Sequence, residues 1–210
     1  MTILALEFSS ERRSVALARG DQVLSEAVDQ SGGRGTKAFG LIETVLAEAQ
    51  VVRDEIQAIA VGLGPGSYTG IRAAIAIAQG WQLATGVKLL GVSSAEAVAA
   101  QAQAMGMFGV VNVVIDAQRG EFYLATWEIS AAAREEIAPL KIVSGSEIVR
   151  IQATRGICVG PEMDRAIFPA ASAIARLASV ASNLVSATDL VPIYLRETAF
   201  VKAGPVRRDE

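Results

Sequence analysis

The most constraining feature of this sequence is that its predicted strands and helices follow the same order twice. Apolar runs bounded by turn residues predict strands, and apolar positions at helical spacing predict helices. The first copy comprises three strands, a helix, a strand and a helix at residues 2–8, 14–18, 22–28, 36–50, 56–62 and 68–84, followed by a strand at 88–92 and a helix at 94–104. The second copy comprises residues 110–116, 121–128, 137–143, a short helix near 147, 156–160 and 169–183. We therefore predict an α/β fold with a duplicated β-β-β-α-β-α unit, divided into halves at residues 1–104 and 105–210.

The first strand of each half ends in a carboxylate, Glu7 in one half and Asp116 in the other, and a hairpin turn follows both. One interpretation is that each side chain accepts backbone N–H groups and starts the turn, a common role of acidic residues. The alternative is a pair of facing phosphate or metal loops. Because the halves are duplicated, we expect the two carboxylates to face each other across a cleft that binds ATP weakly or not at all.

The glycine-rich segment VGLGPGSYTGIRAAIAIAQGW (Val61–Trp81) matches none of the standard phosphate-binding motifs. It contains no lysine, so it is not a Walker loop, and the G-x-G-x-x-G spacing fails at Ser67 and Thr69. The G-x-S-x-G pattern fails because Pro65 stands two residues before Ser67. We interpret the segment as a strand-to-helix turn in which Ser67 caps the helix, with anion binding at the helix N-terminus as a possible addition.

The chain contains no histidine, and this excludes several classes of active site. Ser–His and Cys–His nucleophile pairs and histidine-liganded zinc sites all require an imidazole. The single cysteine, Cys158, rules out an internal disulfide bond. We therefore expect no catalytic residues and no metal site.

The charge and hydropathy of the chain predict a soluble, cytoplasmic protein without membrane association. The net charge is −3, which argues against a broad electrostatic surface for nucleic acid. The apolar runs are too short or too interrupted to span a bilayer, and no basic segment precedes the first strand as in a secretory signal.

The predicted helix at 68–84 has an apolar arc too wide to be covered by one sheet. On a helical wheel this arc spans about 240°, whereas a helix that packs on one sheet needs an apolar stripe of only about 100° or slightly more. Small residues form a row within the arc: Thr69, Ala73, Ala76 and Gly80. The row either packs internally against the helix at 36–49 or forms a subunit interface, which we favour. We expect Phe39 and Ile42 of the neighbouring helix to belong to the same interface.

Four segments together resemble the TsaB (YeaZ) family. They are ILALEFSS near the N-terminus, GLGPGSYTGIR in the middle, IDAQRGEFY at 115–123 and PIYLR at 192–196. Their order and spacing match over nearly the whole chain. The family is similar to the actin-like/Hsp70-like ATPase superfamily, which has an RNase H-like fold, and this implies the same duplicated unit.

The resemblance implies a non-catalytic subunit for threonylcarbamoylation of adenosine 37 (t6A) in tRNAs that read ANN codons. Such a subunit would bind TsaD, join TsaE in a larger complex, form a homodimer when alone through the same surface, and contact tRNA only within the complex. The metal site of TsaD uses an H-x-x-x-H motif, which this chain lacks.

The resemblance also implies that the two carboxylate turns are relic phosphate loops with at most weak nucleotide binding and no required cofactor. Asp116, Arg119 and Gly120 match the family pattern, whereas Glu7 stands where the family usually has Asp. A histidine often found near the start of the first helix is also missing. The competing hypotheses are an active ATPase or small-molecule kinase of the actin-like superfamily and a peptidase, which the lack of histidine disfavours.

Overall fold

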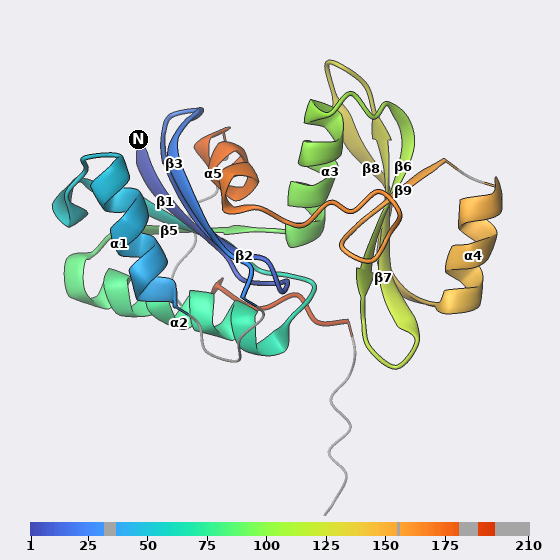
Figure 1. The fold of residues 1–210 in the computed structure, drawn as a ribbon, viewed down its shortest axis with the longest axis horizontal. Helices are drawn as coiled ribbons and strands as arrows, with labels where there is room; N and C mark the ends of the chain where they lie inside the picture. The colour runs from blue at the N-terminus through green and yellow to red at the C-terminus, as the bar shows by residue number, and fades with distance from the viewer. Residues whose placement is uncertain (32–36, 155, 181–188, 196–210) are drawn as a thin grey trace, which may run out of the picture.

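The computed structural model describes residues 1–31, 37–154, 156–180 and 189–195, which form two β-sheets with helices packed on them (Figure 1). The first half contains β1 (Thr2–Glu7), β2 (Arg13–Arg19), β3 (Gln22–Asp29), α1 (Ala38–Glu48), a short 3-10 helix (Arg53–Glu55), β4 (Ala58–Gly62), α2 (Tyr68–Thr85), β5 (Lys88–Val92) and α3 (Ser94–Ala104). The second half contains β6 (Gly109–Asp116), β7 (Glu121–Ile129), β8 (Arg134–Ser144), α4 (Gly145–Thr154), β9 (Ile157–Val159) and α5 (Ala171–Val180). The predicted duplication of the β-β-β-α-β-α order is confirmed, although residues 181–183 of the last predicted helix lie outside the described residues.

The first sheet has the strand order β3-β2-β1-β4-β5, and helices cover both of its faces. β1 pairs antiparallel with β2 and parallel with β4, and every residue of β1 is buried, as expected for a central strand covered on both faces. Leu4 and Leu6 pack towards α1 and α2, whereas Ile3 and Ala5 pack towards α5. The face under α5 is rich in alanine, which lets this helix approach the strands closely.

The second sheet has the order β8-β7-β6-β9, and its two faces are covered unequally. Ala95, Val98 and Ala102 of α3 pack on the face that carries Val113 and Trp127. The opposite face has a smaller apolar cluster beneath α4, around Val114, Leu124 and Ile148.

Two helices therefore pack on the sheet of the other half. α3 ends the first half of the sequence but contacts the second sheet, and α5 follows the second sheet but contacts the first. The division at residue 104 remains a prediction from the sequence, while the packing interlocks the two parts. Among the described helices, none combines the length and apolar composition needed to cross a membrane.

Candidate functional site

The glycines of the Gly62–Gly70 loop allow the end of β1 to pack directly against it. A Cβ on Gly62 would overlap the Glu7 carboxylate, and one on Gly70 would overlap the carbonyl oxygen of Phe8. Gly66 lies in the same way against the carbonyl oxygen of Ser9 and has a φ of +144°. The backbone N–H of Ser67 donates to this Ser9 oxygen at 2.6 Å. The glycines thus serve close approach between two chain segments, and the loop is a strand-to-helix turn as predicted.

The Ser67 side chain caps α2, as the sequence predicts. Its hydroxyl oxygen accepts the backbone N–H of Gly70 at 3.3 Å. Such a cap satisfies one of the free N–H groups at the start of the helix.

The Glu7 carboxylate is buried under this loop, with an exposed fraction of 0%. Its Oε1 accepts the backbone N–H of Ser9 at 2.7 Å, and its Oε2 accepts the hydroxyl of Ser94 at 2.7 Å. Burial raises the pKa of Glu7 above its ordinary value, although the hydrogen bonds from Ser9 and Ser94 act in the opposite direction. The Glu7 side chain is thus enclosed by Ser9, Gly62 and Ser94 and is not exposed at the surface, while the expectation that it faces Asp116 across a cleft between the halves stays a prediction.

Asp116 organises the β6–β7 turn in the way expected for an acidic turn residue. Its Oδ1 accepts the backbone N–H of Gln118 at 2.8 Å, and its Oδ2 accepts the Gln118 side-chain amide at 2.6 Å. Gln118, Arg119 and Gly120 all have positive φ angles, and all three are exposed at the tip of the turn. Among the residues predicted for a phosphate loop, Asp116, Arg119 and Gly120 therefore belong to one exposed turn, whereas Glu7 is buried at the end of β1.

Acidic groups gather where the hairpin turns of the two halves approach each other. Partial desolvation raises the pKa of Glu162, backbone hydrogen bonds lower it, and the negative charges of Asp116 and Glu11 raise it. Glu11 belongs to the β1–β2 turn and Asp116 to the end of β6, so the two turns are near enough to interact electrostatically. Within the described part of the chain, no three His, Cys, Asp or Glu residues are arranged to hold a metal ion.

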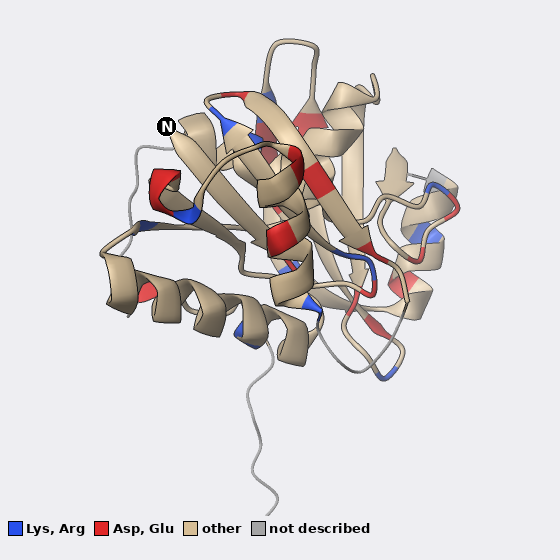
Figure 2. Ribbon diagram, turned by 60° about the vertical axis from the view of Figure 1, so that its left-hand side comes forward, with Lys and Arg blue, Asp and Glu red and all other residues tan. Residues whose placement is uncertain are grey.

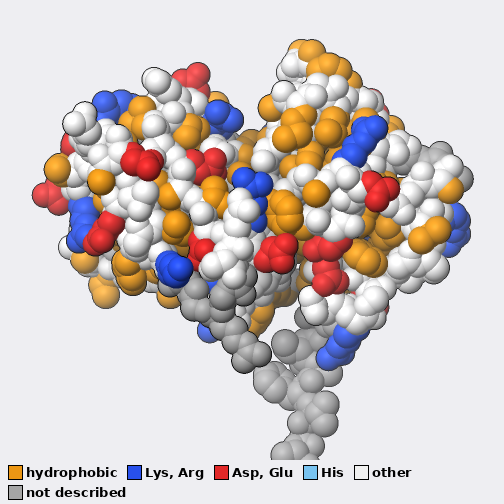
Figure 3. Space-filling model, in the orientation of Figure 1, with side chains coloured by type: hydrophobic (Ala, Val, Ile, Leu, Met, Phe, Trp, Pro, Cys, Tyr) orange, Lys and Arg blue, Asp and Glu red, His pale blue; other side chains and the backbone are white. Residues whose placement is uncertain are grey.

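The molecular surface is notched between two lobes (Figure 3). A pocket of about 230 Å³ lies between the first sheet, α3 and residues 166–172. Its walls include Ser14 and Glu26 of the first sheet, which bind the N-terminus of α5. Ser14 Oγ accepts the backbone N–H of Ala171 at 2.8 Å, and Glu26 Oε1 accepts that of Ser172 at 2.9 Å. These side chains occupy backbone donors that could otherwise bind an anion.

The outer face of α2 is exposed and nearly uncharged. Thr69, Ala76 and Gly80 of the predicted row are exposed, and Ala73 is half-buried. A Cβ on Gly80 would have nothing within 4 Å, so the row does not pack internally. Arg72 is the only charged residue of α2 (Figure 2).

The exposure of three further side chains shows which residues belong to this outer face. Phe39 of α1 is 68% exposed, as expected for an interface residue, whereas Ile42 is only 2% exposed. The expectation that Ile42 belongs to the interface is wrong, because its side chain packs in the core beneath α1. Leu83 is 90% exposed and was missed, although its place beside Ala76 and Gly80 on a helical wheel could have revealed it. We call Phe39, Thr69, Ala76, Gly80 and Leu83 the α2 surface.

The segment after Leu190 lies across the start of α2. The Tyr194 ring stacks on Tyr68 with centroids 5.2 Å apart, and the Arg72 guanidinium lies 5.3 Å from the centre of the Tyr68 ring. The backbone N–H of Ile193 donates to the carbonyl of Leu63 at 2.8 Å. Part of the PIYLR motif therefore packs on the glycine-rich motif, a contact that the sequence gives no means to predict.

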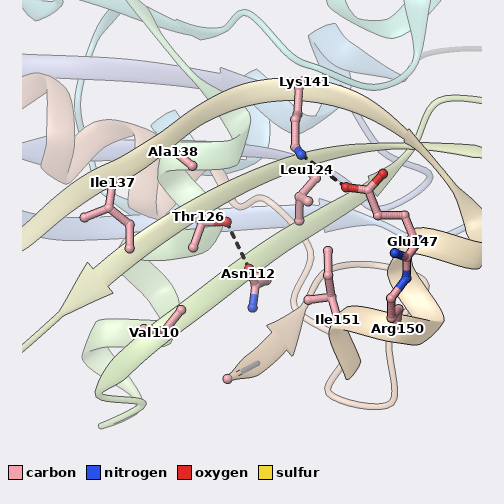
Figure 4. Close-up of a pocket in the computed structure, with 11 residues that line it drawn as sticks. Val110, Asn112, Leu124, Thr126, Ile137, Ala138, Lys141, Glu147, Arg150 and Ile151 are labelled. Carbon is pink, nitrogen blue, oxygen red and sulfur yellow. Dashed lines mark hydrogen bonds and ion pairs between the residues drawn. The ribbon is translucent and has the colours of Figure 1, made fainter. Parts of the chain in front are cut away.

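A cavity of about 900 Å³ lies outside the second sheet and beside α4 (Figure 4). Apolar side chains such as Val110, Ile137 and Ile151 line it. In its floor, Thr126 Oγ1 donates to Asn112 Oδ1 at 2.9 Å. At its rim, Lys141 pairs with Glu147 at 3.1 Å. The cavity exists because α4 alone covers this face.

Comparison with known proteins connects this architecture with tRNA modification. Residues 36–191 match the TsaD family, described as tRNA N6-adenosine threonylcarbamoyltransferase. The tRNA threonylcarbamoyladenosine biosynthesis protein TsaB of Bacillus subtilis is 28% identical over 140 residues, which are 66% of this chain and 60% of that protein. TsaB of Escherichia coli is 32% identical over 128 residues, which are 61% of this chain and 55% of that protein. The chain thus spans about three fifths or less of the length of these curated relatives.

Solved structures match over a larger share of both chains. YeaZ from Pseudomonas aeruginosa superposes with a TM-score of 0.77 and 25% identity, covering 92% of this chain and 99% of that one. An uncharacterized protein with similarity to peptidase YeaZ from Pseudomonas aeruginosa gives a TM-score of 0.80 and 25% identity, covering 93% and 99%. The fold is therefore that of YeaZ, with the duplicated β-β-β-α-β-α order predicted from the sequence. The chain belongs to the TsaD family of tRNA N6-adenosine threonylcarbamoyltransferases, within its TsaB/YeaZ branch.

Proposed function

We propose that this chain is a non-catalytic scaffold subunit for the synthesis of t6A at adenosine 37 of tRNA, and that it acts by binding a TsaD-type catalytic subunit. The observation that carries the proposal is the exposed, nearly uncharged α2 surface with Phe39 and Leu83. Exposed apolar patches of this kind are typical of protein interfaces. The small residues Ala76 and Gly80 would let a partner helix approach closely. The names of the TsaB relatives support the same pathway.

The remaining features of the proposal rest on membership in the TsaB/YeaZ branch. The chain forms a homodimer through the α2 surface when TsaD is absent, joins TsaE in a larger complex, and contacts tRNA only through that complex. It requires no cofactor and works in the cytoplasm. The buried Glu7 and the carboxylates near Asp116 argue against the competing ATPase or kinase function.

The substitution Ala76→Arg tests the proposed surface. It places a long charged side chain in a close helix contact, and overpacking typically costs roughly 1–3 kcal/mol in addition to the burial of charge. A micromolar dimer has only about 8 kcal/mol of binding free energy, so we expect a folded monomer that no longer captures TsaD. Light scattering measures the mass, circular dichroism the fold, and co-purification the capture.

The matched control is Ala153→Arg, which introduces the same side chain at an exposed position of α4. We expect this variant to keep the dimer mass and the capture of TsaD. A folded Ala76→Arg variant with unchanged mass and capture would show that the α2 surface is not the interface.

A further inference from the structure

The geometry points to Glu7 as a positioning residue for the α2 surface: we propose that its buried carboxylate fixes the loop that starts α2 and thereby sets the affinity for the partner. The statement about affinity rests on the proposed function, whereas the statement about the loop does not. Glu7 contacts no partner in this proposal and acts through Ser9, Ser94 and the loop itself.

Glu7 contacts the loop directly. A Cβ on Gly62 would lie 2.6 Å from Glu7 Cδ and would overlap Oε2. The carboxylate therefore fills the space that a side chain at position 62 would need. A side chain at position 62 would therefore require the Glu7 carboxylate to move away from its hydrogen-bond partners Ser9 and Ser94.

Hydrogen bonds through Ser94 join the carboxylate to the loop and to the N-terminus of α3. The Ser94 hydroxyl donates to Glu7 Oε2 at 2.7 Å and accepts the backbone N–H of Gly64 at 3.1 Å. The backbone N–H of Ser94 donates to the carbonyl of Gly64 at 2.8 Å. All three groups are buried, so an unpaired member would be costly.

A second chain of hydrogen bonds connects Glu7 through Ser9 with the cap of α2. Glu7 Oε1 accepts the backbone N–H of Ser9, and the carbonyl of Ser9 accepts the backbone N–H of Ser67 at 2.6 Å. Ser67 is the N-cap of α2, and Thr69 at one end of the α2 surface lies two residues further on. Displacement of the carboxylate therefore moves the first turn of the helix that presents the partner surface.

The experiment is a double-substitution cycle with Glu7→Asp and Gly62→Ala in the full chain. Gly62→Ala alone should weaken capture of the TsaD-type subunit by about tenfold or more, because overpacking a tight contact has effects of this size. Glu7→Asp withdraws the carboxylate by about one carbon–carbon bond, roughly 1.5 Å, and opens space for a methyl group. The double variant should therefore bind more tightly than the Gly62→Ala variant.

Hydrogen exchange at residues 67–70 provides a readout that needs no partner. We expect faster exchange in Gly62→Ala and restored protection in the double variant. As a control, Val113→Ala creates a cavity in the second sheet, where Val113 is 1% exposed, and should lower the melting temperature without changing capture or exchange at 67–70.

Independent, additive effects of the two substitutions on exchange would overturn the role of Glu7. If Gly62→Ala does not fold, Ser94→Ala replaces it, and the expected result is faster exchange at 67–70 with weaker capture. Unchanged exchange in the Ser94→Ala variant would also overturn it. Failure of the wild-type chain to bind TsaD, with the coupling at 67–70 intact, would reject the proposed function and the statement about affinity, but not the positioning of the loop.

Discussion

At the scale of single residues, the buried Glu7 carboxylate makes the stability of the protein depend on pH. Burial raises its pKa in the folded state above its ordinary value of 4.5. Above pH 4.5 the unfolded chain therefore loses a proton that the folded chain retains. The resulting contribution to stability is fully present below the unfolded pKa and is lost as the pH rises through the folded pKa.

Glu7→Gln removes this titration and preserves the shape of the side chain. We expect the unfolding free energy of the wild type, measured relative to this variant, to fall as the pH rises above 4.5, by up to about 1.4 kcal/mol per pH unit. Urea denaturation between pH 4 and pH 8 measures the difference. The same substitution at the exposed Glu135 is the control, and a constant difference for Glu7→Gln would contradict the raised pKa.

At the scale of elements, α2 combines a weak helix-forming residue with an exposed surface. Gly80 lies within the helix, and a Cβ there would meet nothing within 4 Å. Glycine in a helix interior is destabilising by about 0.5–1 kcal/mol relative to alanine. Its presence at an open position therefore suits close approach of another chain better than stability of the isolated subunit.

Gly80→Ala should raise the melting temperature of the dilute protein and weaken its self-association. The added methyl group improves helix propensity but would separate the two helices that the proposed dimer brings close together at Gly80. Calorimetry measures the first effect and analytical ultracentrifugation the second. Val149→Ala on α4, where Val149 is 65% exposed, is the control and should leave association unchanged. Stronger self-association of the Gly80→Ala variant would be evidence against a close helix contact.

At the scale of the whole molecule, the two halves are brought together by exchanged helices and meet at acidic turns. α5 and α3 each bury apolar residues on the sheet of the other half. The resulting arrangement places the charges of Glu11, Asp116 and Glu162 close together. Repulsion from these carboxylates would weaken the binding of a triphosphate between the halves, and Arg12 and Arg119 of the same turns would offset only part of it.

Titration calorimetry with MgATP should accordingly show no binding in the micromolar range. The double variant Glu11→Gln, Glu162→Gln removes two of the negative charges and should bind MgATP more tightly than the wild type, since less repulsion remains. Micromolar affinity and turnover by the wild type would support the competing ATPase or kinase function.

The sequence by itself determined the order of elements, because apolar periodicity and turn residues are local properties of the chain. It also identified Ser67 as the helix cap, gave a turn role as one of two interpretations of Asp116, and favoured an interface over internal packing for the row from Thr69 to Gly80. Each of these depends on neighbours within a few positions. They were therefore predictable without knowledge of the tertiary structure.

Only the tertiary structure decided that Glu7 and Ile42 are buried and that α3 and α5 pack on the sheet of the other half. Glu7 is enclosed by Gly62 and Ser94, which are 55 and 87 positions away, and no local pattern encodes that contact. Ile42 and Phe39 both belong to the apolar pattern of α1, and only the position of the first sheet determines which of them is buried. α3 and α5 pack on the sheet of the opposite half because the apolar face of that sheet is the one they can reach in the folded chain. Apolar periodicity predicts which face of a helix is buried but not which sheet covers it.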